Sequence, residues 1–487
     1  TAISSAIFSL TRASTLASSS AVIACPWLKS KRVLAVLGVV FLAAGYVMSI
    51  MTKDVVSAIT LFFIAVICVI IGTYLMFIAF SIVLLKGLKK NKRYYYQTKH
   101  FATVSGMIYR MKRNAAGLAS ICILSTMVIV TVSTTVCLYA GVGDIINNMY
   151  PYDVNMKYYP YSQQTSEKLE AAAEDTAKRQ GREIKELYSF SKMSFAANRS
   201  GDKLIVDNDT ITGIGSVDVT IITPEDYKRL TGKDAGLKKG EVLIYSEKES
   251  FGDKVELLGE EYRTIKTDEF PKAVFLSIST ANCGIVADSR ETAEAILHRY
   301  EDTTGQIIIN GGMYINLDGT DDEKIAFSNA LNSEAADFEY EFYFLESRQF
   351  VEKEGSYSFY GAFFFLGMFL GLVFIFATVM IIYYKQVSEG YDDRKRFDIM
   401  QKVGMTEAEV KQTIRSQVLI VFFLPLAAAA MHVAFAFPMI RRILAAFSMT
   451  NVTLFAVCTA ATFIGFAVIY LLVYLQTSKT YYSIVRR

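Results

Sequence analysis

The stretch AAGLASICILSTMVIVTVSTTVCLYA, residues 115–140, contains no charged side chain. An α-helix rises 1.5 Å per residue, so a stretch of this length can cross a hydrocarbon core about 30 Å thick. Five other segments are equally free of Asp, Glu, Lys and Arg: residues 33–51, 55–85, 357–384, 416–437 and 452–476. The six segments predict six membrane-spanning helices.

Composition agrees with this prediction. The chain has 487 residues, is 52% hydrophobic and has a mean hydropathy of +0.31. Ordinary soluble domains are about 45–50% apolar even when glycine is counted. We therefore expect an α-helical polytopic membrane protein with six visible spans.

Charge is divided between two parts of the chain. Residues 141–355 carry 40 Asp or Glu and 24 Lys or Arg, whereas the rest carries 7 and 26. An acidic, water-soluble block inserted among apolar segments with basic loops is typical of a membrane protein with one extracytoplasmic domain.

The orientation follows from the positive-inside rule. Residues 86–113 hold nine Lys or Arg and no acidic residue, which places this loop in the cytoplasm and the acidic block outside. Arg441 and Arg442, beside an expected turn at Pro438, are the exception, and long side chains there can reach the headgroups. The expected localisation is a plasma membrane, crossed several times, with the acidic block outside the cell.

The predicted organisation has eight parts. They are an unassigned segment at 1–30, two transmembrane helices at 31–86, a basic cytoplasmic segment at 87–114, a helix at 115–141, an extracellular domain at 142–355, a helix at 356–385, a cytoplasmic coupling segment at 386–415, and two helices with a cytoplasmic tail at 416–487. Residues 1–30 are rich in Ala and Ser and are either a weakly hydrophobic span or remnants of helices that are otherwise absent.

The outer block of about 200 residues mixes helix and strand patterns and predicts an inserted α+β domain. Helices are expected at 165–179, from Pro224 with Thr223 as N-cap, at 291–300 and at 321–332. Strands are expected at 203–207, 217–222, 242–246, 274–279, 285–288, 307–315 and 338–345.

Candidate chemistry in this domain is sparse. His298 is its only histidine and is expected at the surface, and the acidic cluster at 318–323 lacks the spacing of a calcium-binding EF-hand loop. Cys283 is its only cysteine, so no internal disulfide is expected. We expect no catalytic residue and no metal site, and the ligand-binding residues stay unassigned.

The charged stretch 385–415 is the most informative cytoplasmic segment. Phe397, Met400 and Val403 recur at a helical spacing opposite polar side chains, which predicts a short amphipathic helix at the membrane surface. Gly404 can end that helix, and Thr406 with a glutamate three residues later can start the next. The alternative is a solvated loop with basic anchors.

Two sequences in this part of the chain resemble a known family. RKRFDIMQKVGMTEAEV (394–410), followed by an apolar span, and GMIYRMKRNAAGL (106–118) resemble the FtsX-like ABC permeases. The large domain before the last three spans is most similar to the bacitracin-resistance (Bce-type) permeases of Gram-positive bacteria. Such permeases have ten spans and an earlier copy of the first motif. The earlier copy of this motif is absent here, which indicates a partial record of a longer chain or a divergent protein. The start at Thr1 favours the partial record.

The resemblance implies the permease subunit of a peptide-antibiotic ABC transporter. No GxxxxGK[ST] phosphate loop occurs, so ATP and magnesium are expected on a partner ATPase dimer and no cofactor is expected in this chain. The implied ATPase-coupling segment comprises Asp392, Arg394, Arg396, Phe397, Met400, Val403, Gly404, Met405 and Thr406. Further implied partners are a membrane histidine kinase, a peptide antibiotic or lipid-linked cell-wall precursor, and membrane lipid; nucleic acid is not expected.

Two features lie inside the spans. Gly367 and Gly371 form a GxxxG pattern, which suits close helix packing, with a gating role as the alternative. His432 is ionisable within a span, which indicates either a buried hydrogen bond or proton transfer. The competing functions are a membrane-anchored peptide receptor or sensor without transport, and a membrane enzyme, which the wide separation of the three histidines disfavours.

Overall fold

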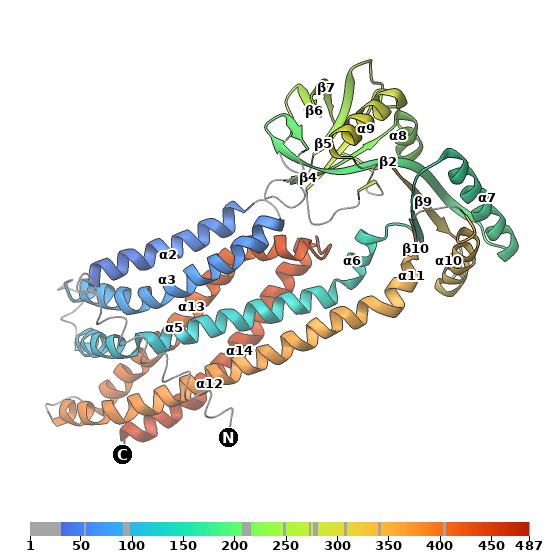
Figure 1. Ribbon diagram of the computed structural model, residues 1–487. Helices are drawn as coiled ribbons and strands as arrows, with labels where there is room; N and C mark the ends of the chain where they lie inside the picture. Colours follow the sequence, from blue (N-terminus) through green and yellow to red (C-terminus); the bar gives the residue numbers. More distant parts are fainter. Residues whose placement is uncertain are drawn as a thin grey trace.

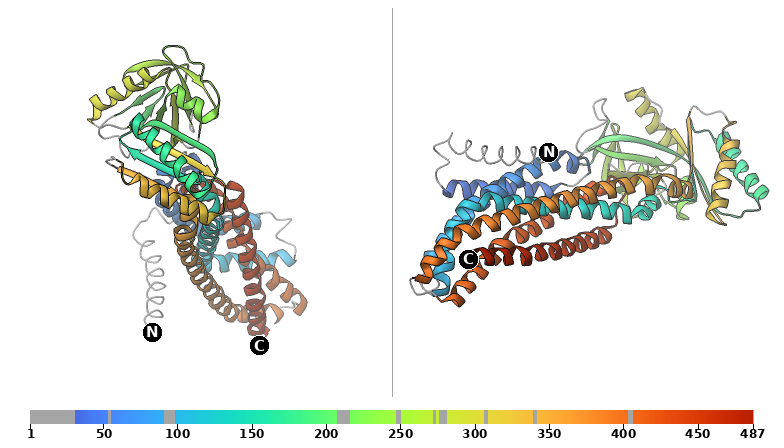
Figure 2. Two further views of the ribbon diagram at one scale, coloured as in Figure 1. Left: turned by 90° about the vertical axis from the view of Figure 1, so that its right-hand side faces the viewer. Right: turned by 90° about the horizontal axis from the view of Figure 1, so that it is seen from below.

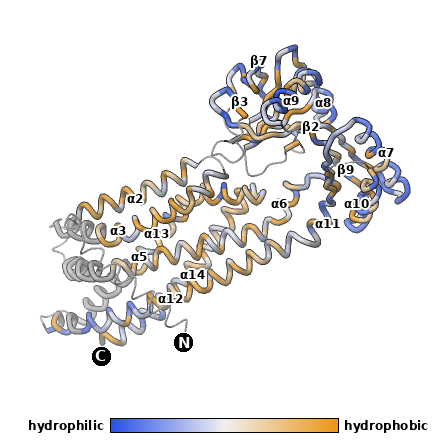
Figure 3. The backbone as a smooth tube through the Cα atoms, viewed as in Figure 1, coloured by the Kyte–Doolittle hydropathy of each residue, from blue (hydrophilic) through white to orange (hydrophobic). Residues whose placement is uncertain are grey.

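The computed structural model describes residues 31–52, 55–90, 98–206, 216–246, 250–271, 274–275, 281–305, 309–338, 342–402 and 406–486. Within them lie six helices long and apolar enough to cross a membrane (Figures 1 and 3). They are α2 (Lys31–Met51), α3 (Val55–Lys90), α5 (Thr98–Ala140), α12 (Tyr357–Lys402), α13 (Glu407–Ala445) and α14 (Val452–Arg486). The prediction of a polytopic membrane protein with one inserted domain is confirmed.

The helices form one elongated bundle with the domain at one end (Figure 1). The C-terminal ends of α3, α12 and α14 and the N-terminal end of α5 lie together at the other end. The described parts of both basic segments therefore lie at one end of the bundle, away from the domain.

Two helices extend from the far end of the bundle to the domain and lie side by side (Figure 2). α5 continues into α6 (Val142–Met149), and α12 is preceded by α11 (Arg348–Val351) and a short π-helical segment, Glu352–Ser356. α12 runs without a break to Lys402, so residues 385–402 extend this long helix and do not form a separate helix as predicted.

The expected turn at Pro438 is wrong, because α13 continues through Pro425 and Pro438 to Ala445. Proline is tolerated in membrane helices where neighbouring groups satisfy the freed backbone. Ser49 Oγ donates a 2.6 Å hydrogen bond to the Phe435 carbonyl, one turn before Pro438. Arg442 lies in the last turn of α13 and donates to the Ser49 carbonyl at 3.3 Å, near the C-terminal end of α2. A cation is favourable there because helix carbonyls lack partners.

The domain is built on one ten-stranded sheet in the order β10-β1-β9-β2-β3-β6-β7-β5-β8-β4, with β2 also paired to β4. The strands are β1 (Val154–Tyr159), β2 (Ile184–Ser200), β3 (Lys203–Ile205), β4 (Ser216–Ile222), β5 (Glu241–Ser246), β6 (Lys254–Leu257), β7 (Glu260–Lys266), β8 (Ala281–Val286), β9 (Ile309–Leu317) and β10 (Phe342–Ser347). The predicted α+β class is confirmed, although β1, β2, β6 and β7 were not predicted.

Four helices cover the sheet: α7 (Gln163–Gln180), α8 (Pro224–Thr231), α9 (Arg290–Thr304) and α10 (Asp321–Ala335). α7 and α10 pack on the half that contains β1 and β9, and α9 packs on the half that contains β4 and β8. Thr223 caps α8 by accepting from the Asp226 N–H, and Gly181 ends α7 at a φ of 66°, as the sequence predicts. β2 is 17 residues long and joins the two halves.

Candidate functional site at the junction of the domain and the membrane helices

Both connections between the domain and the membrane enter the sheet at neighbouring strands. α6 leads into β1, and β10 leads into α11. β1 and β10 are antiparallel partners, with Val154 opposite Ser347. The two long helices α5 and α12 are therefore attached to the same edge of the domain.

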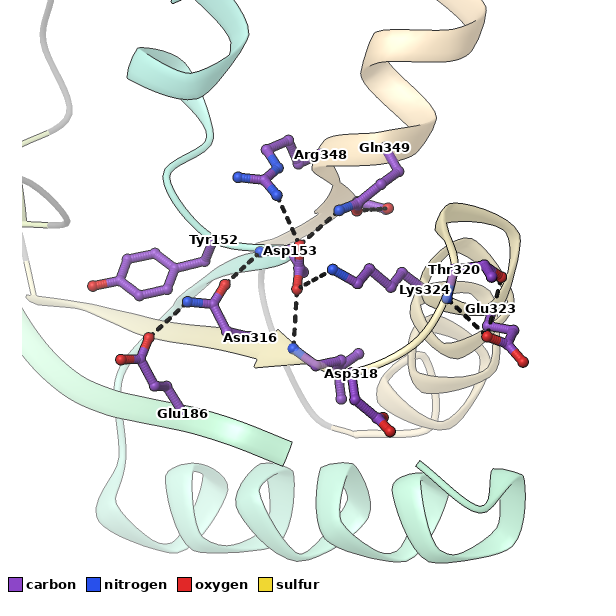
Figure 4. A network of polar contacts seen from close by, with 12 residues as sticks. Tyr152, Asp153, Glu186, Asn316, Asp318, Thr320, Glu323, Lys324, Arg348 and Gln349 are labelled. Atoms are coloured by element: carbon purple, nitrogen blue, oxygen red, sulfur yellow. Dashed lines mark hydrogen bonds and ion pairs between the residues drawn. The ribbon is translucent and has the colours of Figure 1, made fainter. Parts of the chain in front are cut away.

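Asp153, one residue before β1, holds this junction together (Figure 4). Its Oδ1 accepts from Arg348 Nη2 at 3.0 Å and from Gln349 Nε2 at 2.6 Å, both on α11. Its Oδ2 accepts from Lys324 Nζ on α10 at 2.9 Å and from the Leu317 N–H of β9 at 3.0 Å. One carboxylate thus joins the start of β1 to three other elements.

The backbone of Asp153 reinforces these contacts. Its carbonyl accepts from the Arg348 N–H at 3.0 Å, and its N–H donates to Asn316 Oδ1 at 3.1 Å. Asn316 in turn donates to Glu186 Oε2 on β2 at 2.6 Å. The network therefore continues from the membrane connections into the centre of the sheet (Figure 4).

The electrostatics of Asp153 favour its charged form. Only 4% of its side chain is exposed, against 16% for Lys324 and 28% for Arg348. Burial alone would raise the pKa of Asp153, but hydrogen bonds from Leu317, Lys324 and Gln349 hold the pKa below its ordinary value. The junction is thus a buried carboxylate with matched cations.

A pocket of about 440 Å³ lies beside this junction, on its membrane side. Its walls come from α6, the end of β10, α11 and the start of α12. Apolar side chains make up most of the lining: Ile145, Ile146, Met149, Phe350, Val351, Phe359 and Tyr360. Tyr150, Glu346, Gly355 and Ser356 complete it. Since the apolar spans end at Ala140 and begin at Tyr357, the pocket lies at the membrane edge that faces the domain.

The GxxxG glycines lie against α5. A Cβ built on Gly367 would overlap the Thr135 side chain, and one built on Gly371 would lie 2.5 Å from Val132 Cγ2. Real Cβ atoms do not approach other atoms so closely. The absence of side chains at these two positions therefore permits the close approach of α12 and α5.

His432 on α13 joins α13 to the α2–α3 hairpin. Tyr46 Oη lies 2.5 Å from its Nδ1, and Thr73 Oγ1 lies 3.0 Å from its Nε2. The Tyr46 ring also stacks on Phe435, with the ring centroids 4.1 Å apart. Both ring nitrogens therefore have partners, which supports the buried hydrogen-bond interpretation of this residue.

Thr73→Val is expected to loosen the α2–α3 hairpin by about 0.6 kcal/mol, the average value of an interhelical hydrogen bond in a membrane. The matched control is Thr459→Val. Each of the two threonine hydroxyls donates to a carbonyl of its own helix, Thr73 to Val69 and Thr459 to Phe455. Among the described residues, Thr459 has no contact that corresponds to the one between Thr73 and His432. Thermal unfolding midpoints of the two purified variants measure the difference. Equal midpoints would show that the contact with His432 contributes nothing.

The predicted coupling segment spans the end of α12 and the start of α13. Asp392 and Arg394 are exposed on α12, Thr406 directly precedes α13, and Arg396, Phe397 and Met400 lie in the last turns of the α12 backbone. Val403, Gly404 and Met405 lie outside the described residues. The structure therefore places the described members of the segment around the end of α12 that is far from the domain.

Asp393, which the sequence assigned to the polar side of this segment, is buried. Its Oδ2 accepts a 2.7 Å hydrogen bond from Tyr481 Oη on α14, and Tyr481 is fully buried. Gly390, one turn earlier, leaves room for the Tyr481 ring and Ile484. The end of α12 is thereby fixed to α14, by a contact that no local sequence pattern indicates.

The remaining sequence candidates in the domain behave as surface groups. The side chain of His298 is 73% exposed and faces Glu301 at 3.3 Å. Asp318 accepts from the Glu183 N–H at 2.8 Å, and Glu323 caps α10. Among the described residues no group of three His, Cys, Asp or Glu is placed to hold a metal ion.

Comparison with known proteins agrees with this architecture. The chain is 25% identical over 424 residues to the ABC transporter permease protein YxdM of Bacillus subtilis, covering 84% of this chain and 62% of that protein. It is 24% identical over 414 residues to the bacitracin export permease protein BceB of Halalkalibacterium halodurans, covering 82% and 61%. No family model matches.

A shorter match gives higher identity. BceB of Bacillus subtilis is 33% identical over 79 residues, which are 16% of this chain and 12% of that protein. The chain spans about three fifths of the length of the two relatives it matches most extensively. The resemblance to Bce-type ABC transporter permeases is confirmed.

Proposed function

We propose that this chain is the permease subunit of an ABC transporter that senses and detoxifies peptide antibiotics directed against the cell wall. A partner ATPase dimer binds ATP and magnesium, and its hydrolysis of ATP drives release of the drug from its lipid-linked target. In this proposal the domain is extracellular and a membrane histidine kinase is a further partner. The named functions of the relatives, ABC transport and bacitracin export, support the proposal.

The observation that carries the proposal is the continuity of α12. This helix begins beside the pocket and the Asp153 junction, packs on α5 through Gly367 and Gly371, and ends in the predicted coupling segment. A regular helix is stiff along its axis because each turn is hydrogen-bonded to the next. A displacement at the domain therefore reaches the opposite side of the membrane along one element.

The far end of α12 is also constrained laterally. Asp393 bonds to Tyr481 of α14, and the buried side chains of Ile382, Phe422 and Tyr470 pack between α12, α13 and α14. A protein docked on the coupling segment would accordingly move three helices together. An anchored receptor would not need such a connection, which favours the transporter over the receptor.

The double substitution Phe397→Asp with Met400→Asp is expected to abolish co-purification of the ATPase, because it places two charges on the apolar face of the coupling segment. The measurement is the amount of ATPase subunit recovered with the affinity-tagged permease from cells that make both.

The matched control is Tyr391→Asp with Lys402→Gln. It changes the net charge by the same two units, because one aspartate is gained and one lysine is lost. Helical periodicity puts both positions on the face of α12 opposite Phe397 and Met400. We expect it to retain the ATPase. Loss of the ATPase from both variants would contradict a face-specific contact, and absence of any ATPase with the wild type would favour the receptor.

A further inference from the structure

The pocket beside the junction has the chemistry of a site for one particular kind of ligand. Seven of its lining side chains are hydrocarbon or aromatic, and it opens at the membrane edge. An amphipathic molecule held in the outer part of a bilayer can reach such a pocket without leaving the membrane. Pockets of this kind bind through their apolar walls and are made selective by a few polar groups.

Among the described residues, Glu346 is the only charged one in the lining. Within the described part of the chain its Oε2 is buried and has no hydrogen-bond partner. A buried carboxylate oxygen without a partner costs free energy, so the site is incomplete as it stands.

The groups around Glu346 leave it the principal charge of the pocket. The Tyr150 hydroxyl lies near the carboxylate: burial raises the pKa of Tyr150 above its ordinary value, and the negative charge of Glu346 raises it further. Lys157 on β1 is near enough for the Glu346 charge to raise its pKa, although burial lowers that pKa by more. Among the described residues the two side chains form no ion pair. Arg348 is occupied by Asp153.

We propose that this pocket binds the cationic group of an amphipathic ligand, an ammonium or guanidinium carried on an apolar body, with Glu346 as its counter-ion. The inference rests on the proposed function and deepens it: the peptide, through a basic side chain next to apolar ones, enters the pocket. An anionic headgroup such as a lipid pyrophosphate meets a carboxylate there and, among the lining residues that the structure describes, no cation.

The pocket lies between the two attachments of the domain, so a ligand bound in it contacts both. Its walls belong to α6 and to the α11–α12 connection, which are the two attachments of the domain. A ligand that bridges Ile145 or Met149 on one side and Phe350 or Phe359 on the other changes the separation of these attachments. Binding is thereby linked to α5 and α12 and not only to the domain surface.

A cysteine reporter tests this proposal in the full chain, reconstituted in nanodiscs without the ATPase. Ser356→Cys places a thiol in the pocket. Wild-type protein is the blank for the native cysteines, of which Cys122, Cys137, Cys283 and Cys458 are buried and Cys68 is half-buried. Two methanethiosulfonate reagents are compared, one with a trimethylammonium group and one with a sulfonate. We expect the cationic reagent to react about tenfold faster, relative to free cysteine, because of the nearby carboxylate.

Glu346→Gln, added to the reporter, is expected to remove this preference. Asp144→Asn is the matched control, because Asp144 lies on α6 next to a lining residue, is bonded by Asn451 and does not line the pocket. We also expect dodecyltrimethylammonium, and not dodecyl phosphate, to protect the reporter when Glu346 is present.

Equal reaction of both reagents in the Glu346 protein, or equal protection by the two amphiphiles, would overturn the proposal. Faster reaction of the sulfonate reagent would do the same and would indicate an anion site. The reporter assay contains no ATPase, so its result can be interpreted even if the ATPase does not co-purify with the permease. Conversely, a negative reporter result does not affect the co-purification experiment.

Discussion

Asp153→Ala is expected to lower the free energy of unfolding of the junction by about 3–5 kcal/mol. This is the usual result of removing one partner from a buried ion pair, since the remaining cations stay buried without a counter-charge. Here the side chains of Lys324, Arg348 and Gln349 and the backbone N–H of Leu317 all lose the same acceptor. The carboxylate that bridges α10 and α11 is lost with it.

Hydrogen–deuterium exchange of the purified protein measures this effect locally. Peptides from β1 and α11 are expected to exchange at least about a hundredfold faster in Asp153→Ala, since 1.4 kcal/mol corresponds to a factor of ten. Asp318→Ala is the matched control, because Asp318 is half-buried and its side chain accepts, among the described residues, a single hydrogen bond, from the Glu183 N–H. If both variants exchange alike, the ion pairs of the junction do not stabilise it.

The same carboxylate gives the junction an acid dependence of predictable sign. The pKa of Asp153 is lower in the folded protein than in the unfolded chain, so the unfolded state takes up a proton first. The stabilisation is therefore complete above about pH 4, the ordinary carboxyl pKa, and is lost as pH falls through the lower folded value. Exchange of β1 and α11, measured relative to the intrinsic exchange rate at each pH, is expected to accelerate over that range in the wild type and not in Asp153→Ala.

Gly367→Leu is expected to produce the second large effect by separating α12 from α5. Even a Cβ at this position overlaps Thr135, so a leucine forces the two helices apart or twists α12. Overpacking of this kind costs about 1–3 kcal/mol or more. We expect a lower unfolding midpoint and, in a complex with the ATPase, loss of any ligand effect on ATP hydrolysis.

Gly465→Leu on α14 is the matched control. No atom lies within 4 Å of a Cβ built at Gly465, so the substitution adds the same side chain to open space. Leucine is more favourable than glycine in a helix by about 1 kcal/mol. The unfolding midpoint is therefore expected to stay level or rise. A midpoint that falls equally in both variants would show that the α5–α12 contact at Gly367 is not specific.

The membrane helices and several parts of the domain could be predicted from local sequence. Charge-free runs identify the spans, and Thr223, Pro224 and Gly181 mark helix ends through their own backbone preferences. β2 was missed because its sequence, IKELYSFSKMSFAANRS, carries many Lys, Ser and Ala residues with weak strand preference. Its conformation depends on pairing with β9 and β4, which are distant in sequence.

The site was harder to predict than the fold, for the same reason. The spacing of Gly367 and Gly371 is local, so their pattern is visible in the sequence. Asp153 is one of 40 acidic residues in its part of the chain, and its partners lie more than 160 residues away. The pocket likewise forms only because β1 pairs with β10, which brings α6 beside α11.

The extent of α12 also escaped prediction. The sequence beyond Tyr384 becomes charged, which indicates the end of a span but does not require the helix to end. Asp393 then became buried because Tyr481 of α14 supplies a hydrogen bond, a contact between residues 88 positions apart. Polar residues in a long helix are assigned to solvent by periodicity alone, and only tertiary packing corrects this.

The measurement that tests the central claim most directly is ATP hydrolysis by the purified permease–ATPase complex in nanodiscs, with and without bacitracin. If α12 connects the domain to the ATPase, bacitracin changes the rate in the wild type and in Gly465→Leu, and has no effect in Gly367→Leu although the ATPase stays bound. A peptide response that persists in Gly367→Leu, or a wild-type complex that hydrolyses ATP at the same rate with and without peptide, would contradict transmission through this helix.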